Sequence, residues 1–157
     1  MVSLNLEAAL IRFNMKFTIR KVDAKDPKIK AQLLAMQLET LPGDKPYDTD
    51  FGVWWIAYYN KTPAGYAGLA QSRQWSNAGY LCRAGVMPAF QGNGLQKRLI
   101  KARIRKAKHM GYEWLLCDTT ENPRSSNSLI SCGFRIYEPK KKWCQAKTAI
   151  YWRYKVK

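Results

Sequence analysis

The sequence predicts a mixed α/β domain with one central sheet, and three observations support this. The chain has 157 residues, of which 46% are hydrophobic, so it can bury a sizeable core and is not disordered. Strand-length apolar or alternating segments recur along it, and helical patterns lie between them. No apolar run approaches the ~18–20 residues that a membrane span needs.

The first half of the chain predicts one strand, one helix and a hairpin. Residues 17–22 alternate apolar and polar side chains, which is typical of a half-buried strand. Asp26-Pro27 then starts a helix, because Asp is a good N-cap and Pro suits the first helical position. Residues 54–59 and 64–74 are two strands that a turn at Asn60–Pro63 joins into a hairpin.

The second half contains the longest helical pattern, at residues 93–110, which Gly111 ends. The order of elements, with strands and helices interleaved, is that of a mixed α/β domain. The other elements expected here are strands at 80–86, 113–118, 134–137 and 148–154, and a short helix at 122–131.

Residues 1–14 are interpreted as a short amphipathic extension, and residues 15–157 as a single domain. Met15 begins a segment that reads like an opening strand, so it is a candidate for the natural start. The extension lacks a basic start, a long apolar stretch and a small-residue cleavage site, so we do not expect a secretory signal.

Charge and cysteine content restrict the partners and the setting. There are 27 Lys and Arg against 11 Asp and Glu, which gives a net charge of +16. This excess predicts an affinity for nucleic acid, an anionic surface or an acidic protein, although part of it can serve solubility and coenzyme phosphates. The four cysteines show no Cys-x-x-Cys spacing and only His109 accompanies them, so we expect no zinc site and a reducing, cytoplasmic setting.

The glycine-rich turn Gln91-Gly92-Asn93-Gly94 lies between a strand that stops at Pro88 and the long helix. Such a turn leaves main-chain N–H groups unpaired at the positive end of a helix dipole, which suits a diphosphate. Glycines also let oxygen atoms approach the backbone closely. The alternative is a plain connecting turn. The motif is neither a P-loop nor a dinucleotide fingerprint.

The segment resembles the acetyl-coenzyme A signature of the GNAT N-acetyltransferases, Gln/Arg-x-x-Gly-x-Gly/Ala. Gln91 and Gly94 match it, whereas Gln96 replaces the final small residue and either crowds the pyrophosphate or points outward. A second block, Asn122 followed eleven residues later by Gly133-Phe134, matches the family as well. The resemblance implies a mostly antiparallel, twisted mixed sheet flanked by helices, with a V-shaped splay between the fourth and fifth strands.

The resemblance also implies acetyl-CoA as co-substrate and assigns residues to it. The pantetheine arm would lie in the splay and pair with main chain on the fourth strand, while the diphosphate would sit on the turn. The implied coenzyme-binding residues are Gly85, Val86, Met87, Gln91, Gly92, Asn93, Gly94, Leu95, Gln96, Lys97 and Asn122.

The implied chemistry is direct attack of a primary amine on the acetyl carbonyl in a ternary complex. The family's usual Tyr acid is replaced by Leu129, which makes Ser125 or Ser128 the candidate proton donor, unless a solvent-linked thiol needs none. The usual Glu base of the fourth strand is absent from residues 81–84. Asp118 is therefore the preferred candidate base, and a structural role for it is the alternative.

Glu39 and Glu121 are further candidate bases, Arg83 is a candidate for orienting an acidic substrate, and Cys82 is interpreted as a core residue. The acceptor loops are expected at residues 41–52 and 139–146, the second of which is basic and contains Trp143. Three readings remain open. The acceptor is a small-molecule or protein amine, it is a nucleic-acid-borne amine such as an aminoacyl-tRNA or a modified DNA base, or the chain is a non-catalytic basic binding module.

Overall fold

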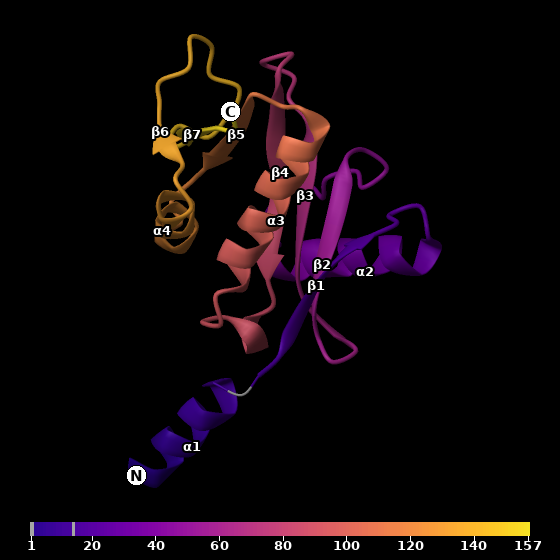
Figure 1. The fold of residues 1–157 in the computed structure, drawn as a ribbon, viewed down its shortest axis with the longest axis vertical. Coiled ribbons are helices and arrows are strands. Elements are labelled where there is room, and N and C mark those ends of the chain that lie inside the picture. The colour runs from indigo at the N-terminus through magenta and orange to yellow at the C-terminus, as the bar shows by residue number, and fades with distance from the viewer. Residues whose placement is uncertain (1, 14) are drawn as a thin grey trace.

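The computed structural model describes residues 2–13 and 15–157, with side chains at 5–11 and from 15 onward (Figure 1). The elements are α1 (Val2–Phe13), β1 (Phe17–Val22), α2 (Pro27–Thr40), β2 (Val53–Tyr59), β3 (Thr62–Gln71), β4 (Ala78–Val86), the 3-10 turn η1 (Pro88–Phe90), α3 (Leu95–Met110), β5 (Trp114–Thr119), α4 (Pro123–Ser131), β6 (Arg135–Ile136) and β7 (Ile150–Lys155). None of the described helices is long and apolar enough to cross a membrane.

The strands form one seven-stranded sheet in the order β1-β2-β3-β4-β5-β7-β6. Every neighbouring pair is antiparallel except β4 and β5, which run parallel. The predicted mixed α/β class with a mostly antiparallel sheet is therefore confirmed.

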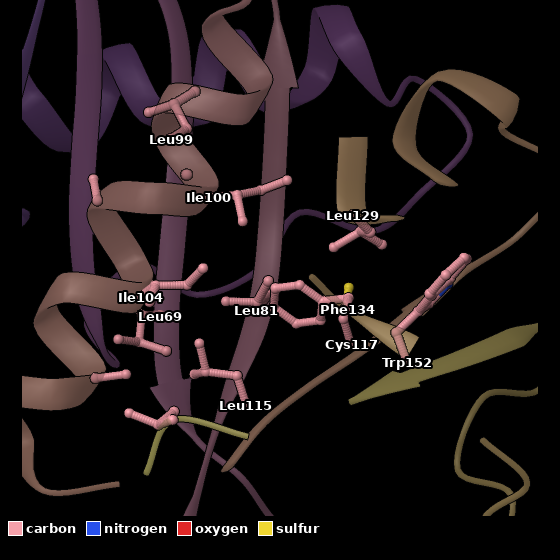
Figure 2. Packing of buried hydrophobic residues seen from close by; sticks show 14 of the residues in the cluster. Leu69, Leu81, Leu99, Ile100, Ile104, Leu115, Cys117, Leu129, Phe134 and Trp152 are labelled. Atoms are coloured by element: carbon pink, nitrogen blue, oxygen red, sulfur yellow. The ribbon is translucent and has the colours of Figure 1, made fainter. Parts of the chain in front are cut away.

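Helices cover both faces of the sheet. Successive strand residues point to opposite sides, and apolar residues on both sides need to be buried. Trp55, Ala67 and Leu81 pack with Leu99 and Ile100 of α3 on one face. The residues adjacent to them in sequence pack instead against Leu33 and Met36 of α2 on the other face. Figure 2 shows the first of these clusters, which continues to Leu129 of α4 and Trp152 of β7.

Strands β4 and β5 separate soon after they begin. Only three residue pairs join them, from Ala78–Trp114 to Tyr80–Leu116, and no pairing follows toward their C-terminal ends. The remaining halves of the two strands therefore diverge and leave an opening in the sheet, which confirms the predicted splay.

Strand β4 carries a bulge where the splay begins. Between the pairs Gly68–Arg83 and Ala70–Tyr80, β3 has one residue and β4 has two. Leu81 and Cys82 of β4 therefore lie opposite Leu69 of β3. A bulge of this kind bends the strand and redirects its carbonyl groups. It therefore shapes the floor of the splay.

The element predictions were accurate except at some ends. Asp26 caps α2 as expected, since its side chain accepts from the N–H groups of Lys28 and Ile29. The helix predicted from residue 93 begins at Leu95, because Gly94 adopts φ +72° and acts as its N-cap. The 3-10 turn η1 was not predicted, and residues 72–74 lie outside β3.

Candidate functional site

The turn before α3 presents a row of unpaired main-chain donors. Gly92 and Gly94 adopt φ of +82° and +72°, which a residue with a Cβ adopts only at a cost. The Asn93 side chain stabilises the turn by donating to the carbonyl of Phe90 at 2.9 Å. Within the described residues, the N–H groups from Gly92 to Lys97 have no hydrogen-bond acceptor, so they are available to an anion.

A cleft of about 760 Å³ runs from this turn toward the splay. It lies between the end of β4 with the start of α3 on one side and α4 on the other. Its walls include nine of the predicted coenzyme-binding residues and both candidate serines: Gly85, Val86, Gln91, Gly92, Gly94, Leu95, Gln96, Lys97, Asn122, Ser125 and Ser128. Met87 and Asn93 do not line it, although both were predicted to bind coenzyme.

The main chain of β4 explains why Met87 does not line the cleft. The Met87 N–H donates to the carbonyl of Ala64 on β3 at 2.8 Å. Because donors alternate along an antiparallel strand, the N–H and C=O of Val86 point away from β3 and into the splay. Val86 is therefore the residue of this segment whose main chain faces the cleft.

Asn122 ends the loop after β5 and begins α4. Its side-chain Oδ1 accepts from the Ser125 N–H at 3.1 Å, which caps the helix. The side-chain nitrogen of Asn122, Nδ2, has no acceptor among the described residues, so it can still donate to a ligand. The capping contact fixes the direction in which that donor points.

A second cavity of about 600 Å³ lies in the splay itself. Both predicted acceptor loops contribute to it, through residues 41–47 and 143–146. Gln37 holds the first loop to α2, since its amide accepts from the Tyr47 N–H at 2.8 Å. Arg83 holds the same loop to β4 through Asp44 at 3.3 Å and the Lys45 carbonyl at 3.0 Å. Arg83 is thus paired within the protein.

Asp118 lies in this cavity and links three segments. Its Oδ1 accepts from the Tyr80 hydroxyl at 2.5 Å and from the Trp143 indole N–H at 2.9 Å. Burial raises the pKa of Tyr80, and the neighbouring Asp118 carboxylate raises it further. The Tyr80 hydroxyl therefore keeps its proton and donates. Trp143 also packs edge-on against Tyr151, with ring centres 4.5 Å apart, so it is not a free aromatic surface.

Gln96 connects the two candidate serines across the junction of the cavities. Its Nε2 donates to Ser125 Oγ at 2.9 Å, and its Oε1 accepts from the Ser128 hydroxyl at 3.5 Å. The side chain thus neither points outward nor crowds the turn. Since Ser125 Oγ accepts from Gln96, the hydroxyl proton of Ser125 is available for donation into the cavity.

Two arginines of the site were not predicted. Arg124, in the first turn of α4, donates to the Gln91 side chain and so spans the mouth of the cleft. Arg103, on α3, lines the floor of the splay cavity and is buried. Both could have been noticed in the sequence, Arg124 as a cation two residues after Asn122 and Arg103 as a cation at core spacing on the long helix.

Three further candidates for chemistry have surroundings that do not favour it, namely Cys82, Glu39 and Glu121. Cys82 is buried against α2 as expected, and burial raises the pKa of its thiol to about 11, which makes it a poor nucleophile. Glu39 lines the coenzyme cleft, not the acceptor cavity, and Glu121 lines neither cavity.

Solved structures with the same fold include three acetyltransferases. A Bacillus subtilis acetyltransferase in complex with CoA aligns with a TM-score of 0.70 at 19% identity, covering 89% of this chain and 99% of that one. The Salmonella typhimurium protein YncA with its cofactor acetyl-CoA gives 0.69 at 19%, covering 90% and 94%. The ribosomal-protein-S18-alanine N-acetyltransferase from Escherichia coli gives 0.69 at 16%, with the same coverages.

The sequence comparisons add a family assignment. No match was found among curated protein sequences. The family model described as Acetyltransferase (GNAT) family matches residues 26–134, which is more than half of the chain and contains both the turn before α3 and the α4 block. The chain therefore belongs to the GNAT acetyltransferase family.

Proposed function

We propose that this protein is an acetyl-CoA-dependent N-acetyltransferase that moves an acetyl group to a primary amine by direct attack in a ternary complex. The observation that carries the proposal is the row of unpaired N–H groups from Gly92 to Lys97 at one end of a continuous groove. The two cavities share Leu41, Ala84, Gln96, Asn122 and Ser125 in their walls, so the groove continues from the turn into the splay.

The groove suits the three parts of coenzyme A. The diphosphate would accept from the turn, and the cationic side chains of Lys97 and Arg124 lie beside it. The pantetheine arm would pair with the main chain of Val86 and with the free amide nitrogen of Asn122. The thioester would then pass the junction beside Ser125 and enter the splay.

The transfer requires one proton to leave the amine and one to reach the coenzyme thiolate. The amine nitrogen attacks the thioester carbonyl, the new C–N bond forms, and the C–S bond breaks. Ser125 would pass a proton to the thiolate as it receives one from solvent water, and the contacts from Ser128 to Gln96 and from Gln96 to Ser125 orient its hydroxyl. Gln96 therefore acts in the proposal as a positioning residue for the acid.

Asp118 would receive the amine proton. Two carboxylates line the splay cavity, and Asp44 is ion-paired with Arg83. Asp118 has no cation within ion-pair distance among the described residues, and its Oδ2 has no hydrogen-bond donor there. The contacts from Tyr80 and Trp143 to its other oxygen hold the carboxylate in place.

Two measurements test the proposal in sequence. Acetyl-CoA in saturating excess should raise the melting temperature, because a ligand that binds only the folded state stabilises it by a few kcal/mol. Release of the coenzyme thiol should then be followed with a panel of primary amines, comprising peptide N-termini, small amines and aminoacyl-tRNA. The tRNA is included because a net charge of +16 favours binding to a polyanion.

A clear stabilisation together with amine-dependent thiol release would support the proposal. Stabilisation without release for any acceptor would favour a non-catalytic binding module on this fold. No stabilisation at all would contradict the coenzyme site itself.

A further inference from the structure

Arg103 is a buried cation without a counter-ion. Its side chain is 3% exposed, and its Nε and Nη1 donate to the carbonyls of Leu99 and Gly68 at 3.2 and 3.3 Å. No carboxylate of the described residues lies within ion-pair distance of it. A guanidinium has five N–H donors, so these two carbonyls leave it incompletely paired.

The remaining donors of Arg103 reach the cavity, where water or an anion completes them. Burial lowers the pKa of Arg103, which reflects the loss of hydration around its charge. An arginine nevertheless stays protonated in proteins, so the charge remains in the core. Keeping a charge in the core costs free energy that an apolar residue would not cost, which favours a ligand-binding role for the cation.

The guanidinium lies where an acyl group would end. Arg103 lines the splay cavity together with Leu81, Ile100, Cys117 and Leu129. Figure 2 shows these four apolar side chains approaching one region from β4, α3, β5 and α4. Arg103 contacts the carbonyl of Gly68 on β3. Gly68 lies opposite Arg83 in the sheet, next to the β4 bulge at the start of the splay.

Arg103 also lies on the donor side of the sheet. It belongs to α3, whose first turn forms the diphosphate end of the groove, whereas the acceptor loop at residues 41–47 follows α2 on the opposite face. Two other cations line the cavity: Arg83, which is paired with Asp44, and Lys45, which belongs to the acceptor loop itself. Of these cations, Arg103 is the buried one, and it lies on the side of the sheet where the coenzyme groove begins, whereas Lys45 is exposed on the acceptor loop.

We propose that the floor of the splay is a carboxylate subsite, in which Arg103 binds the terminal carboxylate of a short dicarboxylic acyl group carried on coenzyme A, of which succinyl is the four-carbon example. This inference rests on the proposed function, because the coenzyme arm must bring the thioester into the splay. The same bonds form and break, and the same protons move, as in the transfer of an acetyl group. The amine forms the C–N bond, the C–S bond breaks, one proton leaves the amine and one reaches the thiolate, and the carboxylate is unchanged.

The test compares three stable thioether ligands by calorimetric titration of the full chain. Carboxypropyl-coenzyme A carries the carboxylate, butyl-coenzyme A is its apolar counterpart, and carbamoylpropyl-coenzyme A is its neutral isostere. We expect the carboxylate ligand to bind about tenfold or more tightly than either of the others, since hydrogen bonds to charged groups carry that much free energy.

Variants then locate the effect. Arg103→Met should lower the affinity for carboxypropyl-coenzyme A to that for butyl-coenzyme A. Its affinity for butyl-coenzyme A should stay within about twofold of the unmodified protein's. Arg105→Met, which removes an exposed cation from the same helix, should keep the preference. If Arg103→Met does not fold, the comparison of the three ligands on the unmodified protein still decides the question.

Equal affinity of the unmodified protein for all three ligands would overturn the subsite, and so would a preference that survives in Arg103→Met. Failure of the proposed function gives a different result, because then none of the three ligands, nor acetyl-CoA, would bind.

Discussion

Placing a carboxylate at the turn before α3 should abolish coenzyme binding, and α3 supplies a matched control at its other end. Gly94 and Gly111 adopt φ of +72° and +79° and flank the same helix. An added Cβ meets no atom within 4 Å at either position. Gly94→Glu and Gly111→Glu therefore introduce the same side chain, the same charge and the same backbone strain.

The two substitutions differ in the sign of their helix-dipole contribution. Each substitution lowers the free energy of unfolding by about 1 kcal/mol, because a residue with a Cβ must adopt the left-handed conformation. This corresponds to a fall of roughly 2–4 °C in melting temperature. A carboxylate is favourable at a helix N-terminus and unfavourable at a C-terminus, by about 0.3–1 kcal/mol. Gly94→Glu should therefore be the more stable of the two variants.

Coenzyme affinity should show the reverse order. A carboxylate about 4 Å from a phosphate charge costs about 1–4 kcal/mol between the dielectric limits of water and a protein surface. Gly94→Glu should thus bind acetyl-CoA at least about fivefold more weakly, whereas Gly111→Glu should match the unmodified protein. Calorimetric titration of both variants, with melting curves alongside, measures the two quantities. Equal affinities would refute the placement of the diphosphate on this turn.

Three further outcomes are expected. Ser125→Ala should lower kcat at least about tenfold with little change in KM for acetyl-CoA, because it removes the proposed acid without touching the turn. Burial raises the pKa of Cys82 to about 11 and of Cys117 to about 12. Folded thiols then keep protons that the unfolded chain loses near its ordinary pKa, so the free energy of unfolding should fall as pH rises from about 9 to 11. A chain that starts at Met15 should keep its melting temperature and coenzyme affinity, since the described side chains of α1 are exposed.

Each of these has its own control. Ser126→Ala, next to Ser125 but outside both cavities, should leave kcat unchanged, and equal losses in the two variants would argue against a specific acid. Urea unfolding followed by circular dichroism gives the pH dependence, which should become shallower in Cys117→Ala. A marked loss of stability on removing residues 1–14 would show that this segment is part of the domain and not an extension.

The order and type of the strands and α-helices from residue 17 onward were predictable, because each carries a local signal. Asp26-Pro27 and Asn122-Pro123 mark helix starts, and the hydrophobic period of residues 95–107 fixes which side of α3 faces the sheet. The two coenzyme blocks were recognisable for the same reason, since each is a short continuous segment.

Contacts between distant segments were not predictable from local patterns. The bridge from Gln96 to Ser125 joins residues 29 positions apart, and the contact from Tyr80 to Asp118 spans 38. Both depend on the splay, which is a property of how β4 and β5 pair. The burial of Arg103 was missed because a basic residue on a helix rich in Lys and Arg is ordinarily solvent-exposed.

Hydrogen exchange with and without acetyl-CoA is the most direct test of the central claim that the groove between the turn and the splay is the coenzyme site. Binding should slow exchange of the amides from Val86 to Lys97 and at the start of α4, and leave the hairpin of β2 and β3 unchanged. Slower exchange confined to other segments, or no change at saturating acetyl-CoA, would contradict the account.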